Sequence, residues 1–77
     1  MPQQIAVVGL GYIGSVTAAC LAELGHSVKG VDKDPLKVNS ILEGRAPFFE
    51  PGLEELIARN VKARRLDATL SMEEALA

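Results

Sequence analysis

Apolar residues along this chain follow two different spacings, and each spacing predicts a type of element. Four consecutive apolar residues at positions 5–8 form the short run typical of a buried parallel strand. Apolar residues then recur every three or four positions, which predicts a helix from about Tyr12 to Leu24 that Gly25 ends in a left-handed conformation. On this pattern Cys20 is a small core residue rather than a reactive thiol. The expected buried stripe of the helix consists of Ile13, Val16, Thr17, Cys20, Leu21 and Leu24.

A second strand and a second helix follow Gly25. Residues 27–32 form a short segment bounded by turns, which predicts a strand. Asp34 followed by Pro35 is the pattern of a helix N-cap with proline at the first helical position, and Gly44 stops this helix. The expected apolar face of the helix consists of Leu36, Val38, Ile41 and Leu42.

The last third of the chain continues the alternation of helix and strand. After a loop at residues 45–50, Pro51 is expected to open a third helix. Residues 66–70 are expected to form a third strand, and Ser71 to start a fourth helix through a capping box. This alternation predicts an α/β fold with a doubly wound parallel sheet, here its N-terminal half with spatial strand order 3-2-1, because right-handed crossovers leave few other arrangements. The expected apolar face of the third helix consists of Leu53, Leu56, Ile57 and Val61.

Composition and charge restrict the possible classes of function. The 77 residues are 48% hydrophobic with a formal net charge of −2, which fits one small globular domain over residues 1–77. The sequence has no basic stripe interleaved with aromatic residues, so nucleic acid is not expected as a partner. Its apolar runs fall short of the ~20 residues of a membrane-spanning helix, and its N-terminus does not resemble a signal peptide, so we expect a cytoplasmic protein without a membrane partner. One cysteine, Cys20, and one histidine, His26, predict neither an internal disulfide nor a metal site.

The apolar run at residues 5–8 leads directly into three glycines with the spacing G-x-G-x-x-G. Gly9 allows the strand to turn sharply, Gly11 allows a pyrophosphate to approach the backbone, and Gly14 allows the next helix to pack closely on the strand. The N-terminus of that helix presents free N–H groups and the positive end of its dipole to the phosphates. A strand before the motif and a helix after it favour a Rossmann-type dinucleotide site over an ordinary glycine-rich turn.

An acidic residue stands where such a site needs one. Asp32 ends the second predicted strand and follows Gly9 by 23 residues, close to the spacing of about 20 expected for the acid that binds the adenosine ribose. Its carboxylate could accept hydrogen bonds from the ribose hydroxyls and would repel the 2′-phosphate of NADP. NAD is therefore the expected cofactor, although the charges of Lys33 and Lys37 favour NADP. The alternative interpretation makes Asp32 a turn residue ahead of Pro35.

Several motifs together resemble the N-terminal segment of the UDP-glucose/GDP-mannose 6-dehydrogenases. They are the glycine turn, Gly25-His26, Asp32 followed by Lys37, and, most specific of all, Phe48-Phe49-Glu50-Pro51-Gly52-Leu53. The resemblance covers essentially the whole chain. It implies that the backbone of Tyr12 and Ile13 lies over the pyrophosphate. It also implies that Asp32 binds the ribose and that Lys37 lies near the adenosine, while the Glu-Pro-Gly-Leu motif only starts a helix. The candidate cofactor-binding residues are therefore Gly9, Leu10, Gly11, Tyr12, Ile13, Gly14, Asp32 and Lys37.

The resemblance also implies an activity. Enzymes of this family use NAD to oxidise the C6 alcohol of UDP-glucose, GDP-mannose or an N-acetylated relative to a carboxylate, as in polysaccharide biosynthesis, through a thioester on a cysteine of a later domain. No catalytic residue and no metal ligand is expected within residues 1–77, so the chain is expected to be an NAD-binding fragment without the catalytic and substrate domains. Its first strand would then have an open edge at Ile5–Val8, and we expect self-association or pairing with the remainder of a longer chain.

Two other functions remain open from the sequence. The 3-hydroxyacid and hydroxyacyl-CoA dehydrogenases share the glycine motif and the Gly25-His26 turn but lack the Glu-Pro-Gly-Leu loop. A non-enzymatic nucleotide-binding module could use the same half of the fold, because a fold does not determine a function.

Overall fold

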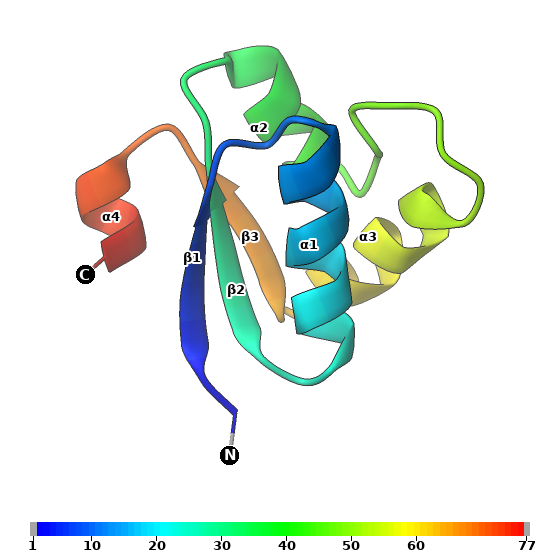
Figure 1. Cartoon of the computed structure of the whole chain (residues 1–77), viewed down its shortest axis with the longest axis horizontal. Coiled ribbons are helices and arrows are strands. Elements are labelled where there is room, and N and C mark those ends of the chain that lie inside the picture. The colour runs from blue at the N-terminus through cyan, green and yellow to red at the C-terminus, as the bar shows by residue number, and fades with distance from the viewer. Residues whose placement is uncertain (1, 77) are drawn as a thin grey trace.

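Three parallel strands form one sheet in the computed structural model, which describes residues 2–76. The strands lie in the order β1-β2-β3, and each pairs in parallel with its neighbour (Figure 1). This order confirms the predicted α/β fold and its 3-2-1 arrangement. The register places Val8 beside Val31 and Val31 beside Thr69, so the three strands end at one common edge. The bounds are Gln4–Val8 for β1, Ser27–Val31 for β2 and Leu66–Thr69 for β3.

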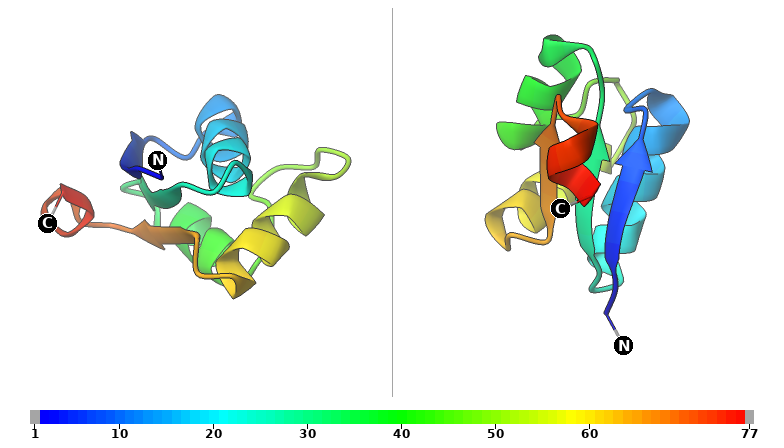
Figure 2. Two further views of the ribbon diagram at one scale, coloured as in Figure 1. Left: turned by 90° about the horizontal axis from the view of Figure 1, so that it is seen from below. Right: turned by 90° about the vertical axis from the view of Figure 1, so that its left-hand side faces the viewer.

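Helices lie on both faces of the sheet. α1 (Tyr12–Glu23), α2 (Pro35–Leu42) and α3 (Leu53–Lys62) cover one face, and the short α4 (Met72–Leu76) lies on the other (Figure 2). The crossovers from β1 to β2 and from β2 to β3 both pass over the first face. Successive right-handed crossovers require this when each new parallel strand is added on the same side of the previous one.

The hydrophobic core lies between the sheet and the three helices α1, α2 and α3. Leu10, Ile41 and Ile57 have no exposed surface, and burying such a side chain completely stabilises the fold by roughly 1.5–3 kcal/mol. The central strand β2 contributes Val28 to this core, whereas Val31, three residues later, is buried on the opposite face of the sheet. The other buried apolar residues are Ala18, Ala19, Ala22, Val38, Leu53, Leu66 and Ala68.

The buried face of α1 differs from the predicted stripe. Ile13 and Leu24 are 77% and 75% exposed, and Thr17 and Cys20 are exposed rather than core residues. Val16 and Leu21 are half-buried against the core, so the prediction holds in part for these two. The rest of the prediction was wrong because residue spacing does not say how closely a helix approaches a sheet. A Cβ on Gly14 would overlap the carbonyl oxygen of Gly9, so α1 packs at a distance where only small side chains fit. The residues that are buried instead are Ser15, Ala18, Ala19 and Ala22.

The second helix begins as predicted but buries a narrower face. The Asp34 carboxylate accepts the N–H of Leu36 at 2.9 Å, which confirms the N-cap. Val38 and Ile41 are buried, whereas Leu36 and Leu42 are 76% and 44% exposed. The prediction is thus confirmed for Val38 and Ile41 and wrong for Leu36 and Leu42, which lie at the two ends of this eight-residue helix, and the first turn of the helix extends past the ends of the strands (Figure 1).

The starts of α3 and α4 give one correction and one confirmation. α3 begins at Leu53 and not at Pro51, because Gly52 adopts a left-handed conformation with φ of 84° that cannot belong to a right-handed helix. Pro51 therefore lies in the turn before the helix. At α4 the hydroxyl of Ser71 accepts the N–H of Glu74 at 3.2 Å, which confirms the predicted cap.

The outer edge of β1 is open within the described residues. There β1 pairs only with β2, so its backbone N–H and C=O groups on the other side face no strand. The side chain of Val8 is 63% exposed at the end of the strand, and Ile5 and Val7 are half-buried. This geometry is the one expected from the sequence for Ile5–Val8.

Candidate functional site

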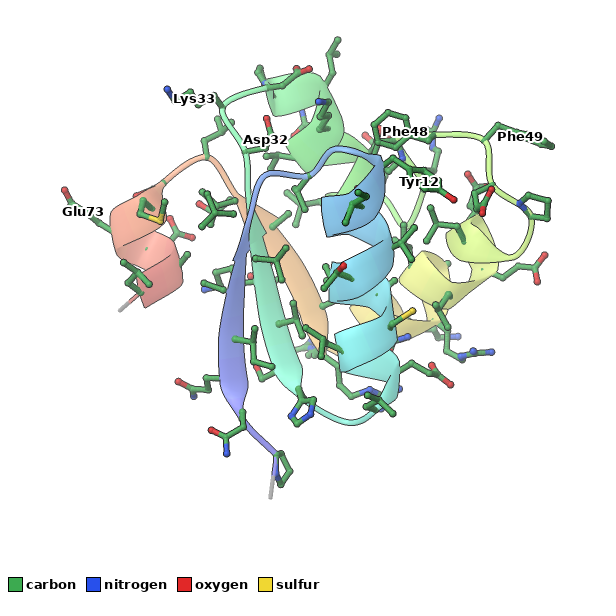
Figure 3. The ribbon with its side chains drawn as sticks, viewed as in Figure 1. Tyr12, Asp32, Lys33, Phe48, Phe49 and Glu73 are labelled. Atoms are coloured by element: carbon green, nitrogen blue, oxygen red, sulfur yellow. The ribbon has the colours of Figure 1, made fainter. Side chains whose placement is uncertain are left out.

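The carboxyl edge of the sheet brings the glycine turn and Asp32 together. Gly9 follows β1 with a φ of 95°, a conformation that glycine adopts without strain. Its N–H donates to the carbonyl oxygen of Val31 at 2.7 Å, which ties the turn to the end of β2. Asp32 follows Val31 directly and therefore lies next to the turn (Figure 3). In open α/β sheets, ligands bind outside the carboxyl ends of the strands, which is where these residues lie.

The N-terminus of α1 offers backbone donors to this space. The first hydrogen bond within the helix runs from the N–H of Ser15 to the carbonyl of Gly11 at 2.9 Å. The N–H groups of Tyr12, Ile13 and Gly14 therefore have no acceptor within the helix. A Cβ on Gly11 would meet no atom within 4 Å, so the backbone is uncovered at this point. Free N–H groups, an uncovered backbone and the positive end of a helix dipole together fit a pyrophosphate group.

The remaining residues of the turn serve packing. Gly14 lies so close to the carbonyl of Gly9 that no side chain fits there. The side chain of Leu10 is fully buried, and a Cβ on Gly30 would lie 2.6 Å from its Cδ2 atom. Leu10 therefore reaches the site only through its backbone N–H.

Two backbone N–H groups hold the carboxylate of Asp32. Leu10 donates to Oδ2 at 2.7 Å, and Asp34 donates to Oδ1 at 2.8 Å. These bonds, the one from Leu10 above all, hold the pKa of Asp32 below its ordinary value, and the charge of Lys37 adds to the effect. The carboxylate is therefore ionised at neutral pH. Because each of its oxygens has two lone pairs, each can still accept a hydroxyl of a ligand.

A cavity of about 370 Å³ opens beside Asp32. This volume lies within the range of roughly 300–1,000 Å³ common to small-molecule sites. Most of its lining is aliphatic. It therefore suits a planar apolar ring that is joined to a polar group able to hydrogen-bond to the Asp32 carboxylate. The lining residues are Val8, Gly9, Val31, Asp32, Lys33, Leu70 and Met72.

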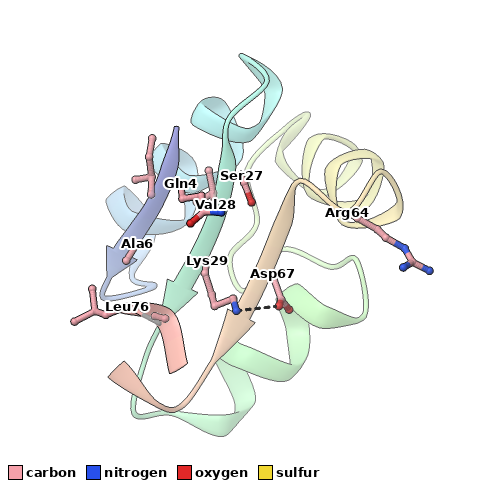
Figure 4. A pocket seen from close by; sticks show the side chains of 10 residues that line it. Gln4, Ala6, Ser27, Val28, Lys29, Arg64, Asp67 and Leu76 are labelled. Atoms are coloured by element: carbon pink, nitrogen blue, oxygen red, sulfur yellow. Dashed lines mark ion pairs between the residues drawn. The ribbon is translucent and has the colours of Figure 1, made fainter. Parts of the chain in front are cut away.

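A second cavity, of about 380 Å³, lies beside the C-terminal part of α4, nearer the amino ends of β1 and β2 (Figure 4). Its charged lining includes Lys29 and Asp67, whose Nζ and Oδ2 atoms lie 3.9 Å apart. Both side chains are substantially exposed, so this ion pair is a weak one. The cavity is remote from the glycine turn and from the N-terminus of α1, so we assign the site to the first cavity despite the similar volumes.

The loop between α2 and α3 makes contacts with the site that the sequence did not predict. The hydroxyl of Tyr12 donates to Oε1 of Glu50 at 2.7 Å, and the carboxylate raises the pKa of Tyr12 through this bond and its charge. The ring of Phe48 packs edge-on against Tyr12, with centroids 6.3 Å apart, and Nζ of Lys37 lies 5.9 Å from the Phe48 centroid. The available signal was composition: two of the three aromatic residues of the chain, Phe48 and Phe49, stand in this one loop.

The structure thus brings all the predicted cofactor-binding residues to one edge. The six residues of the turn from Gly9 to Gly14 lie beside Asp32, and the charge of Lys37 acts on the Asp32 carboxylate from α2. Within the part of the chain that the structure describes, no group of three or more His, Cys, Asp and Glu side chains could hold a metal ion. No helix of that part is long and apolar enough to cross a membrane.

Comparison with known proteins gives consistent matches. The profile of the family described as "UDP-glucose/GDP-mannose dehydrogenase family, NAD binding domain" matches residues 3–77. The GDP-mannose 6-dehydrogenase of Azotobacter vinelandii is 47% identical over 73 residues, and the UDP-glucose 6-dehydrogenase of Rhizobium meliloti is 43% identical over 74 residues. These alignments cover 95% and 96% of this chain but only 17% of each relative. A crystal structure of a ternary complex of GDP-mannose dehydrogenase from Pseudomonas aeruginosa superposes with a TM-score of 0.92 at 42% identity, covering 94% of this chain and 16% of that one.

Proposed function

We propose that this chain, which belongs to the UDP-glucose/GDP-mannose dehydrogenase family and corresponds to its NAD-binding domain, binds NAD across the carboxyl edge of its sheet. The pyrophosphate would lie on the N–H groups at the start of α1, where Gly11 leaves the backbone uncovered. The adenosine ribose would lie at Asp32. The observation that carries this proposal is the Asp32 carboxylate, which the N–H of Leu10 fixes at 2.7 Å beside the N-terminus of α1.

The charge at this position favours NAD over NADP. The free lone pairs of the Asp32 carboxylate would accept the ribose hydroxyls, whereas a 2′-phosphate would place a second negative group against it. Lys33 and Lys37 would weaken this repulsion without removing it. The adenine ring would fit the aliphatic cavity between Val31 and Leu70.

The activity that we propose is that of the whole polypeptide in which this domain works. It is the NAD-dependent oxidation of the C6 alcohol of a nucleotide sugar, namely UDP-glucose, GDP-mannose or a relative, in keeping with the matching relatives named for GDP-mannose and for UDP-glucose. The chain spans about a sixth of the length of those relatives, and we assign none of its residues a catalytic role. Its residues bind and orient the cofactor, which supplies the electron acceptor when bound. We place this activity in the cytoplasm, the compartment expected from the sequence.

Calorimetric titration of the chain with ADP-ribose tests the cofactor site directly. Gly11→Val should abolish binding, because its side chain would fill the space that the pyrophosphate needs. Asp32→Ala should lose roughly 1–3 kcal/mol of binding free energy, the scale of a hydrogen bond to a charged group. The matched control is Asp67→Ala, which removes a carboxylate on β3 that lies outside the site and should not change the affinity. Equal affinities for wild type and Gly11→Val would contradict the assignment.

A further inference from the structure

Phe48 connects the two sides of the candidate cofactor site. Its ring lies edge-on against Tyr12, the first residue of α1, at an interplanar angle of 77°. The ammonium group of Lys37, in the first turns of α2, lies 5.9 Å from the same ring, within the distance of a cation–π contact. Phe48 therefore touches one residue at the proposed pyrophosphate position and one whose charge acts on Asp32.

The same loop is fixed to α1 by a second contact. The hydroxyl of Tyr12 donates to Glu50 at 2.7 Å, so Tyr12 is held by Phe48 on its ring and by Glu50 at its tip. The next residue along the loop makes a natural contrast, because Phe49 is 96% exposed and points away from Tyr12 (Figure 3). One of two adjacent phenylalanines is thus built into the site, and the other is not.

We propose that Phe48 is a positioning residue for the dinucleotide: its ring restrains the ammonium group of Lys37 at the start of α2 and steadies the first turn of α1 at Tyr12. This inference rests on the proposed NAD-binding function. A lysine side chain that is free in solution loses much rotational freedom when a ligand fixes it. Contact with the Phe48 ring restricts Lys37 before the ligand arrives, so less entropy remains to be lost on binding.

The test is a calorimetric titration of the chain with ADP-ribose in three forms. Phe48→Leu keeps apolar bulk in the loop and removes the ring, so the dissociation constant should rise about three- to tenfold, the scale of one exposed cation–π or aromatic pair. Phe49→Leu makes the same change one residue away and should bind like wild type. Phe48→Tyr restores an aromatic ring and should bind within about twofold of wild type. Far-ultraviolet circular dichroism checks that each variant is folded.

A double-mutant cycle separates positioning from general loosening of the loop. Lys37→Gln removes the cation and leaves Phe48 in place, so it should weaken binding by a similar factor and keeps the inference testable even if Phe48→Leu unfolds. In the Lys37→Gln background, Phe48→Leu should cost clearly less than in wild type, because the group that it positions is gone. Additive effects, or a Phe48→Leu variant that binds as well as Phe49→Leu, would overturn the inference while leaving the NAD site intact. Failure of wild type to bind ADP-ribose would overturn the proposed function and this inference with it.

Discussion

Alanine substitutions at Gly14 and Gly11 should separate the two roles that glycine has in this turn. A Cβ on Gly14 would overlap the carbonyl carbon and oxygen of Gly9, which are main-chain atoms and cannot rotate away. Either α1 must move off the sheet or the turn after β1 must shift. A Cβ on Gly11 meets nothing within 4 Å, and the φ of −66° at this residue suits alanine.

Two opposing contributions decide whether Gly14→Ala stabilises or destabilises the fold. Alanine favours a helix interior over glycine by about 1 kcal/mol. Overpacking costs about 1–3 kcal/mol and occasionally more, and an overlap with main-chain atoms falls at the upper end. We therefore expect a net loss of roughly 2 kcal/mol of unfolding free energy. For Gly11→Ala, alanine is the poorer N-cap, which destabilises the fold, but it also lowers the entropy of the unfolded chain, which stabilises it. These effects nearly cancel, so the free energy of unfolding should change by no more than about 0.5 kcal/mol.

Urea denaturation followed by far-ultraviolet circular dichroism measures both changes. Gly14→Ala should lower the transition midpoint without changing the slope, because the surface exposed on unfolding stays the same. Gly11→Ala should leave the midpoint nearly unchanged while weakening ADP-ribose binding. A Gly14→Ala variant that is as stable as wild type, or more stable, would show that α1 does not pack on the strand as closely as the structure has it.

Two further predictions concern the charge at the site and the open strand. Because folding lowers the pKa of Asp32, its ionised carboxylate contributes stability above pH 3.8, the ordinary value, and this stability is lost as the pH falls through the lower pKa of the folded state. Urea midpoints of wild type should therefore exceed those of Asp32→Asn at neutral pH and converge with them in acid; a constant difference would contradict this. The open edge at Ile5–Val8 predicts that the chain self-associates, so sedimentation velocity should show a mass that rises with concentration. A monomer at every concentration, with the amides of Ile5–Val8 protected from exchange, would contradict that prediction.

The features that the sequence predicted well are those that depend on local steric rules. A short apolar run, three glycines at fixed spacing and an acid 23 residues after Gly9 each constrain the backbone near themselves. The strand, the turn and the position of Asp32 followed from these constraints, and so did the family resemblance, which the match to residues 3–77 confirms. The caps at Asp34 and Ser71 were predictable for the same reason, since each bonds to a backbone group two or three residues away.

The features that the sequence did not predict depend on contacts between distant segments. Asn60 occupies a position on α3 where spacing alone would place an apolar residue, yet it is fully buried. Its side-chain amide donates to Glu23 of α1 at 3.0 Å and to the carbonyl of Leu56 at 2.9 Å, and its carbonyl oxygen accepts from Arg65 at 2.9 Å. A buried amide is tolerated only when such partners are present, and these come from 37 residues away as well as from the same helix. The hydrogen bond from Tyr12 to Glu50 likewise joins two residues that are far apart in the sequence, so residue spacing could not predict it.

Leu10 shows how the packing of the core determines the geometry of the site. Its side chain packs against β2 at Gly30, where no other side chain would leave room for it. Its N–H donates to the carboxylate of Asp32, the residue two positions after Gly30. The second oxygen of Asp32 accepts the N–H of Asp34, which itself caps α2. The carboxylate is therefore fixed from the turn, from the strand and from the next helix at once. The orientation of the carboxylate is set when the chain folds. A ligand that fits this orientation therefore binds without the entropy cost of fixing the side chain. A change of core packing at Gly30 should for this reason alter binding at Asp32 even though Gly30 does not line the cavity beside Asp32.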